Sequence, residues 1–399
     1  MSKPTIHPDD IVILGARRTP QGKLLGQLAG VSAVDLGATA ARAALEDSGV
    51  TPQDLDMVIF GQVVQAGAGQ NPARQTAVAA GVPLETPALT VNSVCLSGLR
   101  AIIDAARLLK LGEAQVVLAG GQESMSQAPH VLPSSRTGSS YGTVSLIDSI
   151  EHDALTDAFD QNSMGVNTDH GNLALEVSRS SQDEVAAASH QRAAAAWESG
   201  AFAAEIAPVS VPQRRGEAVI IDTDQGIRPE STAESLGKLR PAFLPEGTIT
   251  AGNSSPLSDG AAAVVLSTRS WAAEQGFEVL ATLGGWAHVG GPDTSLHAQP
   301  ANAISTALDK AGWEVSDLDL LEINEAFASV SVISTEQLGV DPEKVNIHGG
   351  AIALGHPVGA SGARLVVHAA HELASRNTGR AAVSLCGGGG QGDALLLWR

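Results

Sequence analysis

The residues best suited to covalent chemistry are the two cysteines, Cys95 and Cys386, and one histidine, His356. A cysteine thiolate is a strong nucleophile, and an imidazole beside it can activate the thiol by taking its proton. Two cysteines in 399 residues are too few for a disulfide framework, so a reducing compartment and free thiols are favoured. The three residues predict thiol catalysis if the fold brings them together.

The surroundings of Cys95 predict a strand, a turn and a helix. Residues Ala88–Val91 form a short apolar run, and Leu96–Leu111 has apolar residues at helical spacing. Cys95 then stands at a helix N-terminus, where free N–H groups and the helix dipole stabilise a thiolate and can also hold an oxyanion. A buried, inert cysteine is the alternative that this segment alone leaves open.

His356 and Cys386 both lie in glycine-rich segments. His356 is inside Gly349–Gly362, whose glycine density predicts a tightly turned loop close to a ligand or another strand. Cys386 lies near the end of an apolar strand, Val383–Gly388, and four glycines follow it. Their bare N–H groups suit an oxyanion, although such a run is often only a turn. No Gly-Lys-Ser/Thr follows, so the run is not a phosphate loop.

Asn324 follows a third apolar strand, Leu320–Ile323. An asparagine at a strand end can donate to an oxyanion or hold a water molecule. It can equally act as the N-cap of the next helix, and the sequence permits both roles.

An internal repeat organises the chain into two related halves. Its first matches lie 263 residues apart (Ala44 against Ala307), and a later match lies 264 apart (Ser97 against Ser361). At the second offset, His356 corresponds to Asn92, three residues before Cys95. The matched segments are Ala44–Gly49 with Ala307–Gly312, Asp54–Asp56 with Asp317–Asp319, and Ser97–Arg100 with Ser361–Arg364. We therefore expect Cys95 and His356 to face a shared interface between the halves.

The first half alternates strands and helices, which predicts sheets covered on both faces by helices. The expected elements are a strand at Ile11–Leu14, a helix at Ala33–Asp47 and a strand at Met57–Phe60. Residues 126–250 have no counterpart in the second half. They contain a predicted helix, Gln182–Glu198, for which Ser180 or Ser181 is the expected N-cap.

Three domains are therefore expected. Residues 1–125 with 251–278 form the first half, 126–250 an inserted loop domain that shapes a ligand pocket, and 279–399 the second half.

Composition limits the partners. The net charge of −19 disfavours nucleic acid and anionic membrane surfaces, and no apolar run is long enough to span a bilayer. We expect a cytoplasmic protein with no zinc site, because the cysteines and histidines lack ligand spacing. An anionic small ligand would need a local cluster of basic residues, and the best candidates are Arg214, Arg215, Arg228, Lys238 and Arg240.

Four segments together resemble the thiolase family, and within it the acetyl-CoA acetyltransferases. In chain order they are Asn92–Leu99, Asn324–Phe327, Gly349–Gly362 and Cys386–Gly392. The resemblance runs from Ile11 to the C-terminus. It implies a duplicated α/β fold with α/β/α/β/α layers and a large inserted loop domain.

The resemblance also implies a role for each reactive residue. Cys95 takes the acyl group from a thioester, His356 activates Cys95, and Cys386 removes a proton from the α-carbon of a second acetyl-CoA. One oxyanion site is implied at His356 with a water held by Asn324, and another at the N–H groups of Cys95 and Gly388. The implied reaction is a reversible Claisen condensation of two acetyl-CoA to acetoacetyl-CoA and coenzyme A. Coenzyme A is then a substrate, with no tightly bound cofactor.

Coenzyme A contacts are implied at Met164, Arg228, Lys238, Leu239, Ser255 and Phe327. Three positions depart from the family pattern. Ser163 stands where many acetyl-CoA-specific members have His, Pro256 replaces a Gly, and Gln299 lies in a segment that differs from Met-Gly-x-Gly-Pro. A degradative 3-ketoacyl-CoA thiolase for longer chains and a non-catalytic acyl-CoA-binding scaffold subunit remain alternatives. The resemblance implies a homotetramer or a homodimer.

Overall fold

The computed structural model describes residues 5–399, and ten of its strands form one continuous sheet. The strand order is β12-β13-β14-β11-β1-β10-β5-β3-β4, with β2 paired to β10. The strands are β1 (Ile11–Arg18), β2 (Gly22–Lys23), β3 (Met57–Gly61), β4 (Ala88–Val91), β5 (Val116–Ser124), β6 (His130–Val131), β7 (Ile147–Asp148), β8 (Val209–Val211), β9 (Val219–Ile221), β10 (Ser258–Thr268), β11 (Ala281–Gly290), β12 (Leu320–Ile323), β13 (Arg380–Gly387) and β14 (Gln391–Trp398).

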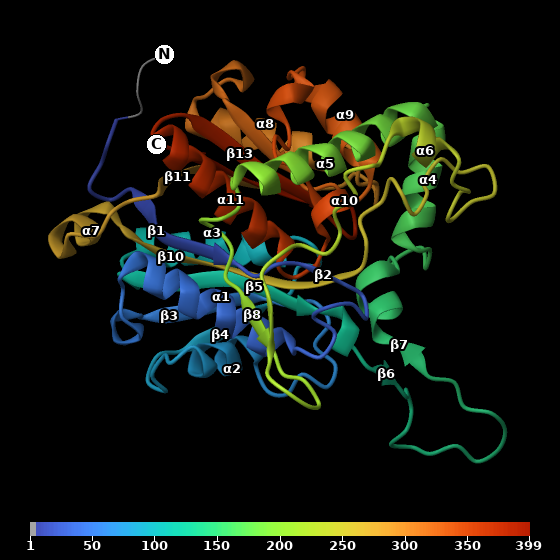
Figure 1. Ribbon diagram of the computed structural model, residues 1–399, viewed down its shortest axis with the longest axis horizontal. Coiled ribbons are helices and arrows are strands. Elements are labelled where there is room, and N and C mark those ends of the chain that lie inside the picture. Colours follow the sequence, from blue (N-terminus) through green and yellow to red (C-terminus); the bar gives the residue numbers. More distant parts are fainter. Residues whose placement is uncertain (1–4) are drawn as a thin grey trace.

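The helices cover this sheet in layers. They are α1 (Ala33–Ser48), α2 (Pro72–Ala79), α3 (Ser97–Lys110), α4 (Met164–Ala174), α5 (Arg179–Ser199), α6 (Ala233–Gly237), α7 (Arg269–Gln275), α8 (Gln299–Ala311), α9 (Ala328–Leu338), α10 (Ala351–Leu354) and α11 (Ser361–Arg376). Helices α1 and α2 pack on the strands of the first half, and α8 packs on those of the second. Helices α3 and α11 contact each other and strands of both halves, so they form the central layer (Figure 1).

The two halves meet where β1 pairs antiparallel with β11. On either side of this junction the strand order is repeated, because β10, β5 and β3 follow β1 as β14, β13 and β12 follow β11. The sequence repeat is thus a structural repeat. Helices α1 and α8 even end alike, at Gly49 and Gly312, which both adopt left-handed backbone conformations that favour glycine.

The inserted residues pack mainly against the second half. Helix α5 contacts α9 and α10 as well as α6, and Figure 1 shows the green helix α5 lying along the orange and red elements of the second half. A buried ion cluster ties the insertion to β1, since Arg18 bonds to the carboxylates of Glu205 and Asp224. The insertion is therefore fastened to both halves.

Most expected elements lie where the sequence predicted them, with one cap misplaced. Helix α5 begins three residues before the predicted start, so neither Ser180 nor Ser181 is its N-cap. Ser178 is the cap, because its backbone is extended and its hydroxyl accepts a hydrogen bond from the Ser181 N–H.

Candidate active site

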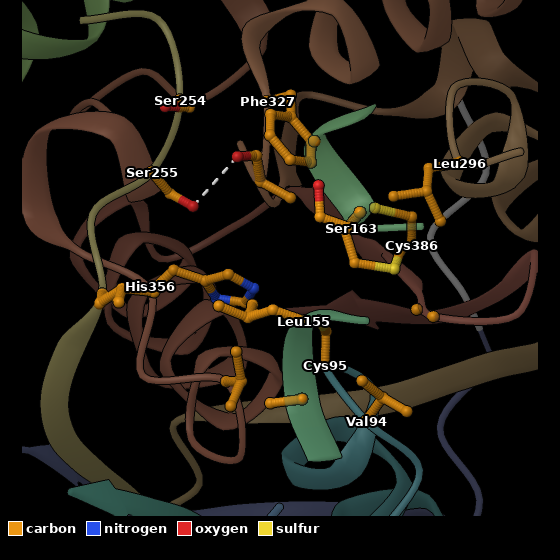
Figure 2. A pocket seen from close by; sticks show the side chains of 18 of the residues that line it. Val94, Cys95, Leu155, Ser163, Ser254, Ser255, Leu296, Phe327, His356 and Cys386 are labelled. Carbon is orange, nitrogen blue, oxygen red and sulfur yellow. Dashed lines mark hydrogen bonds between the residues drawn. The ribbon is translucent and has the colours of Figure 1, made fainter. Parts of the chain in front are cut away.

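A cavity of about 210 Å³ lies where both halves and the insertion meet. Figure 2 shows Cys95, His356, Cys386 and Ser163 around this one space. The residues that line it are Val94, Cys95, Glu151, Ala154, Leu155, Ser163, Met164, Gly165, Phe243, Ser254, Ser255, Pro256, Leu257, Leu296, Ala326, Phe327, His356, Val358, Cys386, Gly387 and Gly388. The two thiols and the imidazole are thus brought together from opposite halves.

A strained turn presents Cys95 to the cavity. Val94, which precedes it, has φ of 52°, a left-handed conformation that a β-branched residue rarely adopts. Hydrogen bonds hold this turn, because the Asn92 side chain accepts from the Val94 N–H and the Ser97 hydroxyl donates to the Val94 carbonyl. Cys95 therefore stands two residues before α3 begins, with its thiol accessible through the cavity.

Burial dominates the electrostatics of the Cys95 thiol. It raises the pKa of Cys95 to about 11, although the backbone N–H groups of Cys95 and Gly388 act in the opposite direction. The carboxyl of Glu123 raises this pKa further. The predicted stabilisation by N–H groups is present, but it is outweighed, so the resting Cys95 side chain is a thiol.

His356 is held as a neutral base. Its Nδ1 lies 2.6 Å from the Ser361 hydroxyl, which also lies 3.1 Å from the Pro357 carbonyl oxygen. Both hydrogen bonds form when Nδ1–H donates to Ser361 and Ser361 donates to Pro357, and we assign this tautomer on that basis. The buried Nε2 then carries a lone pair, and it has no hydrogen-bond partner among residues 5–399. Burial, followed by the charge of Arg364, lowers the pKa of His356 to about 4.

Cys386 lies near the end of β13, opposite Gly392 of β14, and is only 1% exposed. Burial raises the pKa of its thiol, and negative charge on Cys95 raises it further. The two thiols are therefore close enough for the charge of one to oppose ionisation of the other.

Asn324 is buried directly behind the end of β12, where its backbone N–H bonds to Ser384. Within the part of the chain that the structure describes, both polar atoms of its side chain lack a hydrogen-bond partner. The next helix, α9, begins at Ala328 after Phe327 as the N-cap residue, so Asn324 caps no helix. A buried amide without partners needs a water molecule or a substrate atom, but Asn324 does not itself line the cavity.

The residues expected to contact coenzyme A fall into two groups. Met164, Ser255 and Phe327 line the cavity, and Gly388 lines it as well. The Ser255 hydroxyl donates to the Ala326 carbonyl oxygen, the dashed line in Figure 2.

Arg228, Lys238 and Leu239 lie outside the cavity. Arg228 is exposed beside His190, and Lys238 forms an exposed ion pair with Glu234. Leu239 lies against Gly252, where an added Cβ would meet its side chain. These three could contact only the part of a long ligand that remains outside.

Two of the three departures from the family pattern, Ser163 and Pro256, line the cavity. Ser163 is also the N-cap of α4, where its hydroxyl accepts from the Val166 N–H. Gln299 is not part of the wall, and its side-chain amide donates to the Gly291 carbonyl oxygen.

Sequence reasoning missed several wall residues and one buried carboxyl. Leu155, Phe243 and Leu296 complete the apolar wall, and no local pattern distinguishes them from ordinary core residues. Glu123 had a usable signal, because it continues the buried strand β5 beyond Gly120 and Gly121. A charged residue inside a buried strand needs partners and is a candidate for function.

Within residues 5–399, no group of three or more His, Cys, Asp and Glu side chains is arranged to bind a metal ion. Among the same residues, no helix combines the length and apolar character required to cross a membrane.

Comparison with known protein families matches two domains that follow one another along the chain. Residues 11–270 match the thiolase N-terminal domain and residues 277–399 the thiolase C-terminal domain. A probable acetyl-CoA acetyltransferase of Mycolicibacterium smegmatis is 54% identical over 97% of this chain and 100% of its own length. The acetyl-CoA acetyltransferase of Pseudomonas aeruginosa is 48% identical over 98% and 99%.

A solved structure shares the fold. The crystal structure of the Bacillus anthracis acetyl-CoA acetyltransferase superposes with a TM-score of 0.94 at 38% identity, covering 98% of each chain. This chain belongs to the thiolase family and is an acyltransferase enzyme.

Proposed function

We propose that the enzyme is an acetyl-CoA C-acetyltransferase that condenses two acetyl-CoA reversibly to acetoacetyl-CoA and coenzyme A. The observation that carries the proposal is the convergence of Cys95, His356 and Cys386 on one cavity. The names of relatives that are 46–54% identical over nearly the whole chain support the acetyl substrate.

In the first half-reaction, Cys95 attacks the thioester carbonyl while the lone pair on His356 Nε2 accepts the thiol proton. The leaving thiolate of coenzyme A takes that proton from His356, so acetyl-Cys95 and free coenzyme A result. The backbone N–H groups of Cys95 and Gly388 act on the Cys95 sulfur, and this supports a role for them in stabilising the transient oxyanion.

The second half-reaction needs a separate base, because Cys95 is then acylated. Acetyl-Cys95 cannot ionise, so no negative charge on its sulfur opposes ionisation of Cys386 in this step. Neutral His356 takes the thiol proton of Cys386, and the Cys386 thiolate takes a proton from the α-carbon of the second acetyl-CoA. The resulting carbanion attacks acetyl-Cys95. The C–C bond forms, the Cys95 sulfur leaves, and it regains a proton from His356, so that Cys95, Cys386 and His356 all end neutral. Protons balance over the cycle.

Substrate size fits this division of labour. A cavity of about 210 Å³ cannot enclose a whole coenzyme A molecule, so we infer that it holds the acyl group and the end of the pantetheine arm. The mostly apolar wall suits both. The nucleotide would lie outside, on the side of the molecule where Arg228 and Lys238 are candidates for contact.

Acetylation of the purified protein tests the proposal. After brief incubation with acetyl-CoA, peptide mass spectrometry should find one acetyl group on the Cys95 peptide. The group should be absent in Cys95→Ser and should accumulate in Cys386→Ser, which retains the nucleophile but lacks the second base. An unmodified Cys95 peptide would leave the scaffold alternative as the better explanation.

Thiolysis of 3-ketoacyl-CoA substrates of increasing length separates the two enzymatic alternatives. We expect the highest kcat/KM with acetoacetyl-CoA. A clear preference for long chains would favour the degradative thiolase, whose best support is the presence of Ser163 and Pro256 in the cavity wall.

From the family resemblance alone, we also propose that the enzyme is cytoplasmic and that it forms a homotetramer or a homodimer. Sedimentation of the purified protein tests the assembly.

A further inference from the structure

Glu123 is a fully buried carboxyl that the reaction above does not use. Its Oε2 accepts hydrogen bonds from the backbone N–H groups of Val63 at 2.9 Å and Gly359 at 3.0 Å. Its Oε1 accepts from the Val64 N–H at 3.2 Å. One side chain thus joins a loop of the first half to the loop that carries His356.

Both joined loops reach the nucleophile. Val63 and Val64 belong to the apolar cluster that packs against Cys95, together with Val358. The Asn92 side chain, three residues before Cys95, donates to the Val63 carbonyl oxygen at 3.3 Å. Glu123 therefore contacts loops on two sides of Cys95.

The loops approach so closely that the positions beside Glu123 admit no side chain. A Cβ at Gly359 would lie 2.8 Å from Glu123 Oε2 and 2.7 Å from the Gln122 carbonyl oxygen. A Cβ at Gly121 would collide with the Gly359 carbonyl oxygen. This packing leaves no room for water at the carboxyl and holds its three N–H donors in place.

The carboxyl also acts on Cys95 through its charge. Burial raises the pKa of Glu123 to about 8, while the three N–H donors lower it and Asp259 on β10 raises it. The charge of Glu123 in turn opposes ionisation of the Cys95 thiol. The charged or titratable groups beside this pair are Asp259, Cys386 and His356, the last on the same loop as Gly359.

We propose that Glu123 is a positioning residue that clamps the two loops beside Cys95 and, once ionised, sets a negative potential at the Cys95 sulfur that opposes loss of the thiol proton. The proposal rests on the proposed function in one respect, namely that Cys95 is the nucleophile. The potential itself can be measured without any substrate.

A pair of alkylating reagents measures that potential. Iodoacetate and iodoacetamide have similar size and both react with the thiolate, but only iodoacetate is negatively charged. The rate of each reaction at Cys95 is followed on the Cys95 peptide by mass spectrometry. The accessibility of the thiol and its thiolate fraction affect both rates alike, so they cancel in the ratio. In the wild-type enzyme we expect the iodoacetate-to-iodoacetamide ratio to fall as the pH rises from about 6.5 to about 9, while Glu123 ionises.

Glu123→Gln should remove most of this dependence. At about pH 9 its ratio should exceed that of the wild type by about threefold or more, and the two should converge near pH 6.5. The matched control is Asp169→Asn, which alters another buried carboxylate that accepts from three backbone N–H groups, those of Leu244, Thr248 and Ile249. It should keep the wild-type ratio.

Gly359→Ala separates charge from packing. It disturbs the clamp but keeps the carboxylate, so we expect slower acetylation of Cys95 with a nearly unchanged reagent ratio. A wild-type ratio that stays constant from pH 6.5 to 9 would overturn the proposal even if Glu123→Gln does not fold. Equal ratios in wild type and Glu123→Gln, or an equal rise in Gly359→Ala, would do the same.

Failure of the proposed function would look different. A wild-type enzyme that is alkylated at Cys95 with the expected pH dependence, but never acetylated by acetyl-CoA, would retain the electrostatic role of Glu123 and lose the catalytic assignment of Cys95.

Discussion

The resting site holds neutral reactants, a thiol and an imidazole, because burial disfavours charge on both. The pKa of Cys95 is raised to about 11 and that of His356 is lowered to about 4. A preformed thiolate–imidazolium pair is therefore disfavoured at neutral pH. In the proposed reaction, proton transfer from Cys95 would therefore accompany attack on the thioester, when the negative charge moves from sulfur to an oxygen that N–H groups can stabilise.

The acid limb of the acetylation rate should report the low pKa of His356. We expect single-turnover acetylation of Cys95 to stay within about twofold from pH 7 down to about pH 5. The His356 imidazole binds a proton more readily in the unfolded chain than in the folded one. The stability contributed by neutral His356 is therefore lost as the pH falls from about 6.5 to about 4. Rapid quenching and mass spectrometry, with circular dichroism to confirm folding, check the rate. Half-loss near pH 6.5 would contradict an imidazole held neutral.

Ser361→Ala should slow acetylation about tenfold, because Nδ1 loses the hydroxyl that orients the imidazole and supports the charge it takes up. KM should change little, since Ser361 does not line the cavity. Ser375→Ala is the control, because its hydroxyl also donates to a backbone carbonyl, that of Glu372, but at the far, exposed end of α11. Equal rates in both variants would show that the ring needs no such support.

At this scale, the sequence predicted which side chains meet better than it predicted their protonation states. Cys95, His356 and Cys386 were found from residue type, glycine-rich context and the repeat, and they do share a cavity. Their protonation could not be predicted, because burial depends on residues far away in the chain. Glu123 illustrates the same limit, since its three donors come from two segments, around positions 63 and 359.

Among the elements, α3 and α11 matter most for the site, because their N-terminal ends approach across the junction of the halves. A Cβ at Gly98 would lie 2.9 Å from the Ala363 nitrogen, and one at Gly362 would lie 2.5 Å from the Leu99 nitrogen. The two glycines occupy equivalent places in the repeat. Each allows the opposite helix to come close enough for Cys95 and His356 to share one space.

Gly362→Ala should therefore destabilise the protein by about 1–3 kcal/mol, because the added methyl group meets backbone atoms that cannot move aside alone. It should also slow acetylation by separating the two helices. Gly30→Ala is the control, since a Cβ there meets nothing within 4 Å. Denaturant unfolding of both variants at equal protein concentration measures the difference. A Gly362→Ala midpoint as high as that of Gly30→Ala would mean that the helices adjust freely.

Regular elements were predicted well where local pattern suffices. The strands Ala88–Val91 and Leu320–Ile323 have the predicted bounds. Helix α1 differs from the prediction by one residue at its C-terminal end, and α3 differs by one residue at each end. Helix α5 was predicted to begin too late because four consecutive polar residues precede Gln182, and several of them could act as caps. The packing of the insertion against the second half depends on contacts between residues far apart in the sequence, and no local pattern encodes these.

The whole molecule carries a net charge of −19, and coenzyme A thioesters are anions as well. Long-range repulsion should slow their encounter, and salt screens it. We expect kcat/KM for acetyl-CoA to rise about twofold between about 20 and 150 mM NaCl. S-acetylpantetheine, which has no phosphate groups, should show no such rise. A fall with salt would instead indicate that local cations such as Arg228 and Lys238 dominate the approach.

The central hydrophobic core belongs to neither half. Leu99 and Ile103 of α3 pack in one cluster with Leu365 and Val366 of α11. A fragment that ends at Gly276, between α7 and β11, would leave its face of this cluster open to water, as would its complement. Each fragment produced alone should aggregate, whereas coproduction should restore a single particle by complementation. For the same reason, we expect one half alone to have no activity, because the enzyme works only when both halves are present.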